Sequence, residues 1–371
     1  MKRILEMFGE PITYGGQESV VYNMLSTFDL RNDFKVDLFT PYFADNKHLI
    51  KLITDNNGNV YSLNKEFKTN DNRFLLSKDV NSFFDKNCNY DVVHIHTGSL
   101  TTMYVYAKAA KEHNIKKVIV HSHIASKKNG LVCKLFKTII CMLLQKYVDV
   151  YLGCSKEAIT SKFTEKIVDK SKVVYNGIDV GKFRFNNEYR EDIRNKYSIR
   201  DKFVIGSLGR LDKQKNNNFM IDIINNFSGY DNIILMIVGT GTTENDLKNK
   251  CIDLGVDKKV IFTGNQVETY KYYCAFDCFI LPSIYEGMPV TAIEAQISGL
   301  PTLISDRVTT DVSISSECKF VNIVATNDWV ERIKEIYNNK INCISRENIS
   351  IDYDKFDRSK TFKVLENIYN E

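Results

Sequence analysis

Short apolar segments rich in valine and isoleucine alternate with segments of helical periodicity along nearly the whole chain. Continuous apolar strands separated by helices are typical of parallel sheets that are covered on both faces. The fold class predicted is therefore α/β. The first series of predicted strands comprises Ile4–Phe8, Val36–Thr40, Val92–Ile95, Val118–Val120, Val150–Leu152 and Val173–Tyr175, and the second comprises Phe203–Ser207, Ile233–Val238, Val260–Thr263, Cys278–Leu281 and Thr302–Ile304.

The two series of strands predict two doubly wound domains. A chain of 371 residues is long enough for two domains of ordinary size. Residues 181–200 lie between the two series and are polar and rich in charge, so the boundary is expected near residue 185. Since ligands of open parallel sheets bind beyond the carboxyl ends of the strands, the two domains are expected to face a common cleft. A last helix is indicated by the spacing of Phe362, Leu365, Ile368 and Tyr369.

The composition excludes several classes of protein. The chain has 50 basic and 46 acidic residues and a formal net charge of +4, so we expect no nucleic-acid partner. No apolar run reaches the roughly 18 residues of a membrane span. The nine cysteines are odd in number, and a chain of this length can build its cores without disulfides. Reduced thiols and a cytoplasmic location are therefore expected.

Two adjacent glycines follow the first predicted strand. Gly15 and Gly16 come directly before a segment of helical periodicity. Glycines at a helix start let backbone N–H groups come close to an anion, and the helix dipole adds to the attraction. An ordinary turn has the same composition, so this motif alone is a weak indication of an anion site.

A second loop carries fixed positive charge after the strand Phe203–Ser207. Arg210 suits two-point contacts with a phosphate group, and Lys215 adds a compact charge. A bound diphosphate and a solvated basic loop explain these residues about equally well.

A third loop combines two acids with a predicted helix start. Pro289 is expected to be the first helical residue, and the N–H groups of Gly287 and Met288 would form an anion site with the helix. Glu286, in the loop, can accept hydrogen bonds from sugar hydroxyls. Glu294 lies among apolar helix residues, where a carboxylate seldom stays without a partner. An exposed helix face is the alternative for Glu294.

One further glycine-rich turn resembles a dinucleotide-binding fingerprint. It begins at Gly239, but Glu244 stands where the third glycine of that fingerprint belongs. The next strand ends in Gly264 and Asn265, without an acid that could bind a ribose. A turn that helps to shape a mononucleotide pocket is therefore favoured over an NAD site.

Four of the six histidines fall at the ends of two predicted strands. His94 and His96 end one strand, and His121 and His123 end another. Residues two apart share a face of a strand. A metal site is conceivable, but no carboxylate or cysteine stands beside these histidines at ligand spacing, so no metal is predicted. Their place at the rim of the expected cleft favours a role in the site.

Residues 101–150 carry a local excess of positive charge, with nine lysines and two acids. Within this stretch, residues 134–146 mix basic and apolar side chains at helical pitch. Such a segment suits an anionic membrane surface, and it equally suits a core helix whose lysines face water. The lysines assigned to membrane contact are Lys127, Lys128, Lys134 and Lys137.

Taken in order, these motifs resemble the retaining glycosyltransferases of family four, which have the GT-B fold, and above all the branch that builds bacterial capsules and exopolysaccharides. The resemblance covers both domains. It implies an acceptor-side domain over residues 1–184, a nucleotide-sugar domain over residues 185–354, and a last helix in residues 355–371 that returns to the first domain. The matching motifs are Gly15-Gly16, His121-Ser122-His123, Asn176-Gly177-Ile178-Asp179, Gly209-Arg210 with Lys215, and Glu286 with Glu294.

The resemblance also implies a role for each residue. Gly16 would approach the donor β-phosphate, and Arg210 and Lys215 would hold the diphosphate. Glu286 would bind the transferred sugar and Glu294 the nucleotide ribose. His123 would lie near the sugar, with His121 as the rival assignment. The site residues expected are Gly15, Gly16, His123, Arg210, Lys215, Glu286, Gly287, Met288 and Glu294, with His96, His121, Gly239 and Asn265 as further candidates.

The function expected is transfer of a hexose or N-acetylhexosamine from a UDP-sugar to a glycan acceptor, lipid-linked and at the inner face of the plasma membrane. Family members work without a metal or other cofactor. Loss of the diphosphate builds negative charge on the leaving group, which fixed cations and helix N-termini stabilise. Retention in the family is ascribed to front-side attack, with a donor phosphate oxygen taking the acceptor proton. The alternatives are a GT-B sugar-nucleotide epimerase and a non-catalytic nucleotide-sugar-binding partner subunit.

Overall fold

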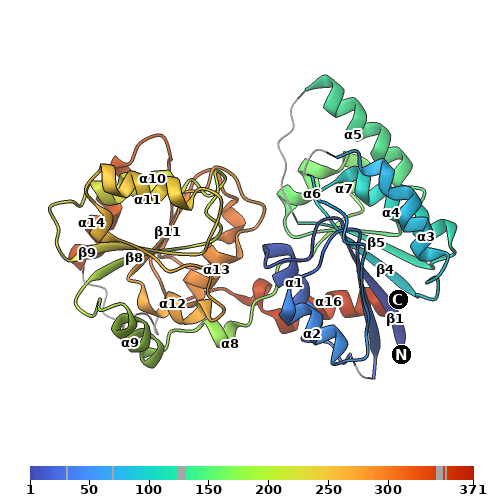
Figure 1. Ribbon diagram of the computed structural model, residues 1–371, viewed down its shortest axis with the longest axis horizontal. Coiled ribbons are helices and arrows are strands. Elements are labelled where there is room, and N and C mark those ends of the chain that lie inside the picture. Colours follow the sequence, from blue (N-terminus) through green and yellow to red (C-terminus); the bar gives the residue numbers. More distant parts are fainter. Residues whose placement is uncertain (31, 69–70, 124–129, 340–345, 347–348) are drawn as a thin grey trace. The chain divides into compact units, whose positions relative to one another are not determined.

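The computed structural model describes the chain except residues 31, 69–70, 124–129, 340–345 and 347–348 (Figure 1). The chain forms two compact units. Unit 1 comprises residues 1–177 and 355–371, and unit 2 comprises residues 178–354. The last segment of the chain therefore belongs to the same unit as the first.

Unit 1 is built on a sheet of seven parallel strands in the order β3-β2-β1-β4-β5-β6-β7. The order reverses between β1 and β4, which are neighbours in the sheet although more than 80 residues separate them in sequence. The strands are β1 (Lys2–Phe8), β2 (Phe34–Thr40), β3 (Val60–Ser62), β4 (Val92–His96), β5 (Lys117–Ser122), β6 (Val150–Gly153) and β7 (Lys172–Val173).

Helices cover both faces of this sheet. Side chains of the last helix, α16, pack in the core on one face with those of β1 and α1, and Figure 1 shows α16 in red beside the blue α1 and α2. A separate apolar cluster that includes α3 and α4 fills the other face. The helices of unit 1 are α1 (Gly16–Leu25), α2 (Lys47–Thr54), α3 (Ser77–Phe84), α4 (Leu100–Glu112), α5 (Leu131–Leu144), α6 (Lys156–Lys162), α7 (Glu165–Val168) and α16 (Arg358–Asn370).

Unit 2 repeats this plan with six parallel strands in the order β10-β9-β8-β11-β12-β13. Here the order reverses between β8 and β11. The strands are β8 (Phe203–Leu208), β9 (Ile233–Val238), β10 (Val260–Phe262), β11 (Cys278–Leu281), β12 (Thr302–Ser305) and β13 (Cys318–Val321).

The helices of unit 2 lie on both faces of its sheet (Figure 1). Side chains of α10, α11 and α14 fill the main core together with β8 and β9. On the other face α8 and α9 pack on α12, so the polar stretch 181–200 belongs to unit 2. The helices are α8 (Val180–Phe183), α9 (Asn187–Lys196), α10 (Asn217–Asn225), α11 (Glu244–Asp253), α12 (Thr269–Ala275), α13 (Val290–Ile297) and α14 (Asn327–Asn339).

The predicted α/β class is confirmed, and each predicted strand is present with ends shifted by at most two residues. Two edge strands, β3 and β13, were not predicted. In the described residues no helix has the length and hydropathy needed to cross a bilayer. The eight cysteines described all carry free thiols, and Cys343 lies outside that part.

Candidate functional site

The second and third sequence motifs meet at the point where the strand order of unit 2 reverses. Lys215 follows β8, and Glu286 follows β11, which is the neighbour of β8 in the sheet. The Lys215 Nζ donates to Glu286 Oε1 at 2.6 Å, and the Ser283 hydroxyl donates to the same oxygen at 2.7 Å. Because both partners are largely buried, this ion pair is a fixed part of the loop structure. Reversal points of this kind are where open parallel sheets bind their ligands.

Arg210 lies in the same loop and keeps its guanidinium in water. Its side chain is 71% exposed, and its Nη2 lies 3.4 Å from Asp212 Oδ2. Asp212 also accepts a hydrogen bond from the backbone N–H of Lys215 at 3.1 Å. An exposed ion pair of this kind contributes about 0–1 kcal/mol, so an anionic ligand can replace Asp212 as the partner of Arg210 at little cost.

The glycine-rich turn after β9 packs against the basic loop. Gly239 has φ of +137°, and a Cβ atom there would lie 2.0 Å from the carbonyl oxygen of Gly209. The backbone N–H of Gly239 donates to the carbonyl of Gly264 at 2.9 Å, which joins the loops after β9 and β10. Asn265, next in the chain, is exposed. The turn is therefore a close backbone contact among three loops, and it requires glycine at 239.

The start of α13 lies in the third loop, directly after Glu286. Pro289 is the N-cap, and Val290 is the first helical residue, so the prediction that Pro289 begins the helix was wrong by one position. Met288 is buried and Gly287 is half-buried. The hydroxyl oxygen of Thr291, in the first turn, is buried and has no hydrogen-bond partner in the described part of the chain. The first turn of α13, which follows Glu286 closely in sequence, thus contains a buried hydroxyl that a ligand could bond.

Glu294 is held by a tyrosine of the neighbouring helix. The Tyr273 hydroxyl of α12 donates to Glu294 Oε2 at 2.7 Å. Burial raises the pKa of Glu294 to about 7, although the hydrogen bond from Tyr273 acts in the opposite direction. Glu294 is therefore partnered, and the alternative of an exposed helix face is wrong.

Gly15 and Gly16 lie in unit 1, at the start of α1. Gly15 is the N-cap, and a Cβ atom there would come within 2.5 Å of Glu18 Oε2. A Cβ atom on Gly16 would meet nothing within 4 Å. Gly16 is therefore not required for packing within the described structure, and its N–H is the first of a helix of ten residues.

The histidines at the ends of β4 and β5 form one cluster with a buried glutamate of β1. Glu6 Oε2 lies 2.6 Å from His96 Nε2, and His96 Nδ1 lies 2.9 Å from His123 Nε2. The register of the sheet explains the cluster, because Glu6 is paired with His94 and His96 with His121 across adjacent strands. Paired residues of a parallel sheet and residues two apart on a strand share one face.

Three of these histidines, on β4 and β5, could in principle form a metal site. Ring nitrogens of His94, His96 and His121 lie within 4.8 Å of one another, which is close enough for a shared ion. Both ring nitrogens of His96 already have partners, however, in Glu6 and His123. The rings of His94 and His121 are parallel within 7°. With His96 so engaged, His94 and His121 are the members of the trio that keep ring nitrogens without a hydrogen-bond partner in the described residues, and two histidines are fewer ligands than a metal site uses.

Sequence reasoning missed Glu6 and Tyr369. It looked for an acid near the histidines in sequence, whereas the acid is on the first strand and the tyrosine, whose hydroxyl donates to Glu6 Oε1 at 2.8 Å, is on the last helix. A usable signal was present, because Glu6 is the one charged residue of the predicted strand Ile4–Phe8. Such a residue is seldom buried without a partner.

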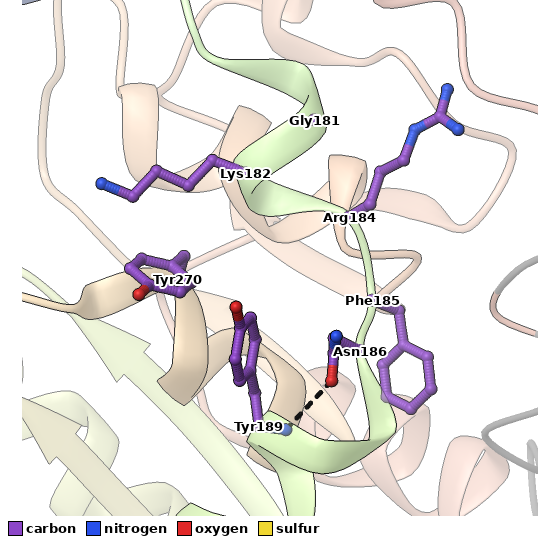
Figure 2. Close-up of a pocket in the computed structure, with 7 residues that line it drawn as sticks. All are labelled: Gly181, Lys182, Arg184, Phe185, Asn186, Tyr189 and Tyr270. Atoms are coloured by element: carbon purple, nitrogen blue, oxygen red, sulfur yellow. Dashed lines mark hydrogen bonds between the residues drawn. The ribbon is translucent and has the colours of Figure 1, made fainter.

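A small pocket of about 240 Å³ lies elsewhere in unit 2, between the segment around α8 and helix α12 (Figure 2). In it, the Lys182 ammonium lies 4.8 Å from the centre of the Tyr270 ring. The Asn186 side chain accepts a hydrogen bond from the backbone N–H of Tyr189 at 3.1 Å and caps α9. The site residues predicted from the sequence do not line this pocket.

The structure describes two of the four lysines assigned to a membrane surface, and these two differ in exposure and in hydrogen bonding. Lys127 and Lys128 lie outside the described residues. Lys134 is exposed on α5. Lys137 is half-buried and donates to the backbone carbonyls of Thr160 and Ser161, both at 3.1 Å. Lys137 is thus engaged within unit 1.

The chain is similar to known glycosyltransferases in sequence. The family model described as glycosyl transferases group 1 matches residues 189–352. The putative glycosyltransferase EpsF of Bacillus subtilis is 26% identical over 317 residues, which cover 84% of this chain and 81% of EpsF. An Escherichia coli protein named UDP-Gal:alpha-D-GlcNAc-diphosphoundecaprenol alpha-1,3-galactosyltransferase is 30% identical over 253 residues, or 62% of this chain and 63% of that protein.

Solved structures show the same fold over the full chain. Alr3699/HepE of Anabaena in complex with UDP-glucose has a TM-score of 0.79, at 18% identity, and covers 100% of both chains. A variant of Staphylococcus aureus TarM in complex with UDP and other ligands has a TM-score of 0.72 at 14% identity, again over 100% of both chains. Residues 189–352 therefore match the group 1 glycosyl transferases, and the two parallel-sheet units have the GT-B fold.

Proposed function

We propose that this glycosyltransferase is a retaining enzyme that moves a hexose or N-acetylhexosamine from a UDP-sugar to a lipid-linked glycan in the synthesis of a cell-surface polysaccharide. The observation that carries the proposal is the Lys215–Glu286 pair at the strand reversal of unit 2, with Arg210 beside it in the same loop. It joins two cations that suit a diphosphate to a carboxylate that suits sugar hydroxyls.

The chemistry follows from these contacts. The donor diphosphate would take the place of Asp212 at Arg210 and lie against the Lys215 ammonium, so that the charge released on the leaving group meets cations already in position. Glu286 accepts hydrogen bonds from Lys215 and Ser283 through Oε1 and retains acceptor capacity for a sugar hydroxyl. Glu294 would bind the ribose, for which its position beside Tyr273 leaves a second carboxylate oxygen. The roles of Gly16 and His123 rest on the resemblance.

Support for the donor and acceptor classes comes from the relatives. Solved structures of Alr3699/HepE hold UDP, and UDP-glucose. The name of the E. coli relative gives a UDP-galactose donor and a diphosphoundecaprenol-linked acceptor. Retention would follow from front-side attack, in which a donor phosphate oxygen accepts the proton of the acceptor hydroxyl. In this route the protein supplies cations and orients the two substrates, and it needs no nucleophilic side chain.

The test of this function is turnover with a panel of UDP-sugars and undecaprenyl-diphosphate-linked acceptors. We expect one donor to give product with the anomeric configuration of the donor, and Glu286→Ala to lower kcat/KM by about 10²-fold or more. Glu268→Ala is the matched control, since Glu268 is an exposed acid of unit 2 that pairs with Lys271. Activity of Glu286→Ala within about twofold of wild type contradicts the proposal. Isomerised donor in the absence of acceptor would instead favour the epimerase.

We also propose that unit 1 docks on an anionic membrane through α5. Five of its apolar side chains are exposed at helical spacing. Lys134 is exposed on the same helix, and Lys127 and Lys128 come just before the helix in sequence. An apolar stripe next to basic residues matches an anionic bilayer surface. The exposed apolar residues are Val132 (82%), Leu135 (64%), Phe136 (45%), Ile139 (46%) and Met142 (64%).

Replacing Leu135 and Met142 by glutamate is therefore expected to abolish flotation with phosphatidylglycerol liposomes, because it puts two charges on the stripe and removes two apolar contacts. Ile252→Glu is the matched control, since Ile252 is a single apolar residue of unit 2 that is 65% exposed. It should float like wild type. Charge reversal of Lys127, Lys128 and Lys134 should weaken flotation in a salt-dependent way. Unchanged flotation of the Leu135→Glu/Met142→Glu variant would refute the assignment to α5.

A further inference from the structure

The buried histidine cluster of unit 1 contains a continuous hydrogen-bonded chain. It begins at the Tyr369 hydroxyl of α16, which donates to Glu6 Oε1 at 2.8 Å. It continues from Glu6 Oε2 to His96 Nε2 at 2.6 Å and from His96 Nδ1 to His123 Nε2 at 2.9 Å. The chain ends at His123 Nδ1, a buried atom that has no hydrogen-bond partner in the described residues.

We propose that Glu6 is a positioning residue that, acting through His96, decides whether Nδ1 of His123 is a hydrogen-bond acceptor or a hydrogen-bond donor. This inference deepens the proposed function and rests on it, because it assigns a chemical state to the histidine that the resemblance places near the transferred sugar. It concerns the binding state of His123 and adds no covalent step.

The two states follow from the number of protons in the chain. With Glu6 ionised, its oxygens accept from Tyr369 and from a proton on His96 Nε2. His96 Nδ1 must then accept a proton from His123 Nε2, so Nδ1 of His123 carries a lone pair and accepts a hydrogen bond.

With a proton on Glu6 Oε2, the hydrogen bonds from Glu6 to His96 and from His96 to His123 each have their donor and acceptor interchanged. Glu6 donates to His96 Nε2, His96 donates from Nδ1 to His123 Nε2, and His123 carries its proton on Nδ1, where it donates. Going from the second state to the first, the chain loses one proton, formally from His123 Nδ1, while the others shift along it. Both imidazoles stay neutral throughout.

Burial keeps both imidazoles neutral and disfavours the ionised form of Glu6. It raises the pKa of Glu6 to about 8 and lowers the pKa of His96 to about 3. It also holds the pKa of His123 well below its usual value. The titratable groups that contact Glu6 are His94 and His96 from β4 and Tyr369 from α16, and His121 of β5 stacks on His94. His94 Nδ1 lies 2.5 Å from the same hydroxyl, and a neutral His94 with its proton on Nδ1 donates to the Tyr369 oxygen, which leaves Tyr369 as the donor to Glu6 in both states.

The direct test is the ring ¹⁵N spectrum of the full chain labelled at histidine, recorded from pH 6.5 to 9.5 without substrate. Protonated and unprotonated ring nitrogens have distinct shifts, so each histidine reports its tautomer. We expect His96 and His123 each to switch from the tautomer protonated at Nδ1 to the tautomer protonated at Nε2 as the pH rises. Both should switch with one midpoint near pH 8. His113, which contacts Asp85 and lies outside this hydrogen-bonded series, should change independently of His96 and His123 and serves as the comparison. Patterns that do not change with pH, or that change separately in the two residues, would overturn the proposal.

Two variants complete the test. Glu6→Gln removes the ionisable group with little change of shape, so the joint exchange near pH 8 should disappear, and so should the corresponding break in the pH profile of kcat/KM. Tyr369→Phe removes a hydrogen bond that favours the carboxylate, so the midpoint should move to higher pH. An unchanged midpoint in Tyr369→Phe, or retention of one zinc ion per chain after dialysis, contradicts the proposal. Because the spectra need no turnover, failure of the glycosyltransferase assay would not be confused with failure of this inference.

Discussion

Replacing Lys215 by methionine is expected to lower kcat/KM for sugar transfer by about 10²–10³-fold, the usual loss when one preorganised charge is removed from a developing anion. Methionine keeps the length of the side chain and removes the ammonium. The Lys215 side chain is only 15% exposed, so water replaces its charge poorly. Steady-state kinetics with the cognate UDP-sugar measures the effect.

Lys213→Met is the control for this variant, because Lys213 lies in the same loop and is exposed. It should remain within about twofold of wild type. Melting temperatures of both variants show whether the loop still folds, since Lys215→Met also removes the ammonium from the Glu286 carboxylate, which keeps its hydrogen bonds from the Ser283 hydroxyl and the Gln214 amide. Equal losses in the two variants would mean that the general charge of the loop matters and that the Lys215–Glu286 pair does not.

Replacing Gly239 by alanine is expected to affect both the stability of unit 2 and donor binding. A residue other than glycine at φ of +137° is strained, and its Cβ atom would lie 2.0 Å from the Gly209 carbonyl. Because that atom belongs to a backbone, the loop that carries Arg210 must move. We expect a loss of about 2 kcal/mol or more. For a unit of this size this corresponds to a fall of about 4–8 °C in its melting temperature.

The displaced loop should also raise KM for the donor by about tenfold, which is ~1.4 kcal/mol of binding free energy. Gly229→Ala is the matched control. Gly229 lies on the surface of the same unit, and a Cβ atom there meets nothing within 4 Å. A melting temperature of Gly239→Ala equal to that of Gly229→Ala would show that the loops after β8 and β9 are not tightly packed.

Strands with continuous apolar sequence were the part of the fold that could be predicted. Ile233–Val238 is fully buried, and its sequence has no polar residue, so its ends were predicted to the residue. The two strands that were missed lie at sheet edges and lack that signal. Val60–Ser62 is only half-buried, and Cys318–Val321 includes an exposed lysine. An edge strand pairs on one side alone, so its residues need not be apolar.

The part of the candidate site that could be predicted consists of residues in loops directly after strands. The contact between Lys215 and Glu286 could be predicted because each residue lies in a loop after an apolar strand, and the parallel sheet brings such loops to one edge. Glu6 was not identified, because its neighbours depend on the register between β1 and β4. The partner of Glu294 is likewise fixed by the packing of α12 on α13, which no spacing in the sequence reports.

The most direct test of the central claim, that Arg210 and Lys215 of unit 2 bind the diphosphate of a nucleotide sugar, is thermal stabilisation by UDP. A ligand at 100 times its dissociation constant adds about 2.7 kcal/mol to the stability of the folded state. We predict a saturable rise in the melting temperature of the wild-type chain with UDP, and none in the Arg210→Ala/Lys215→Met variant at the same concentrations. No rise in the wild-type chain at millimolar UDP, or an equal rise in the variant, would contradict the claim.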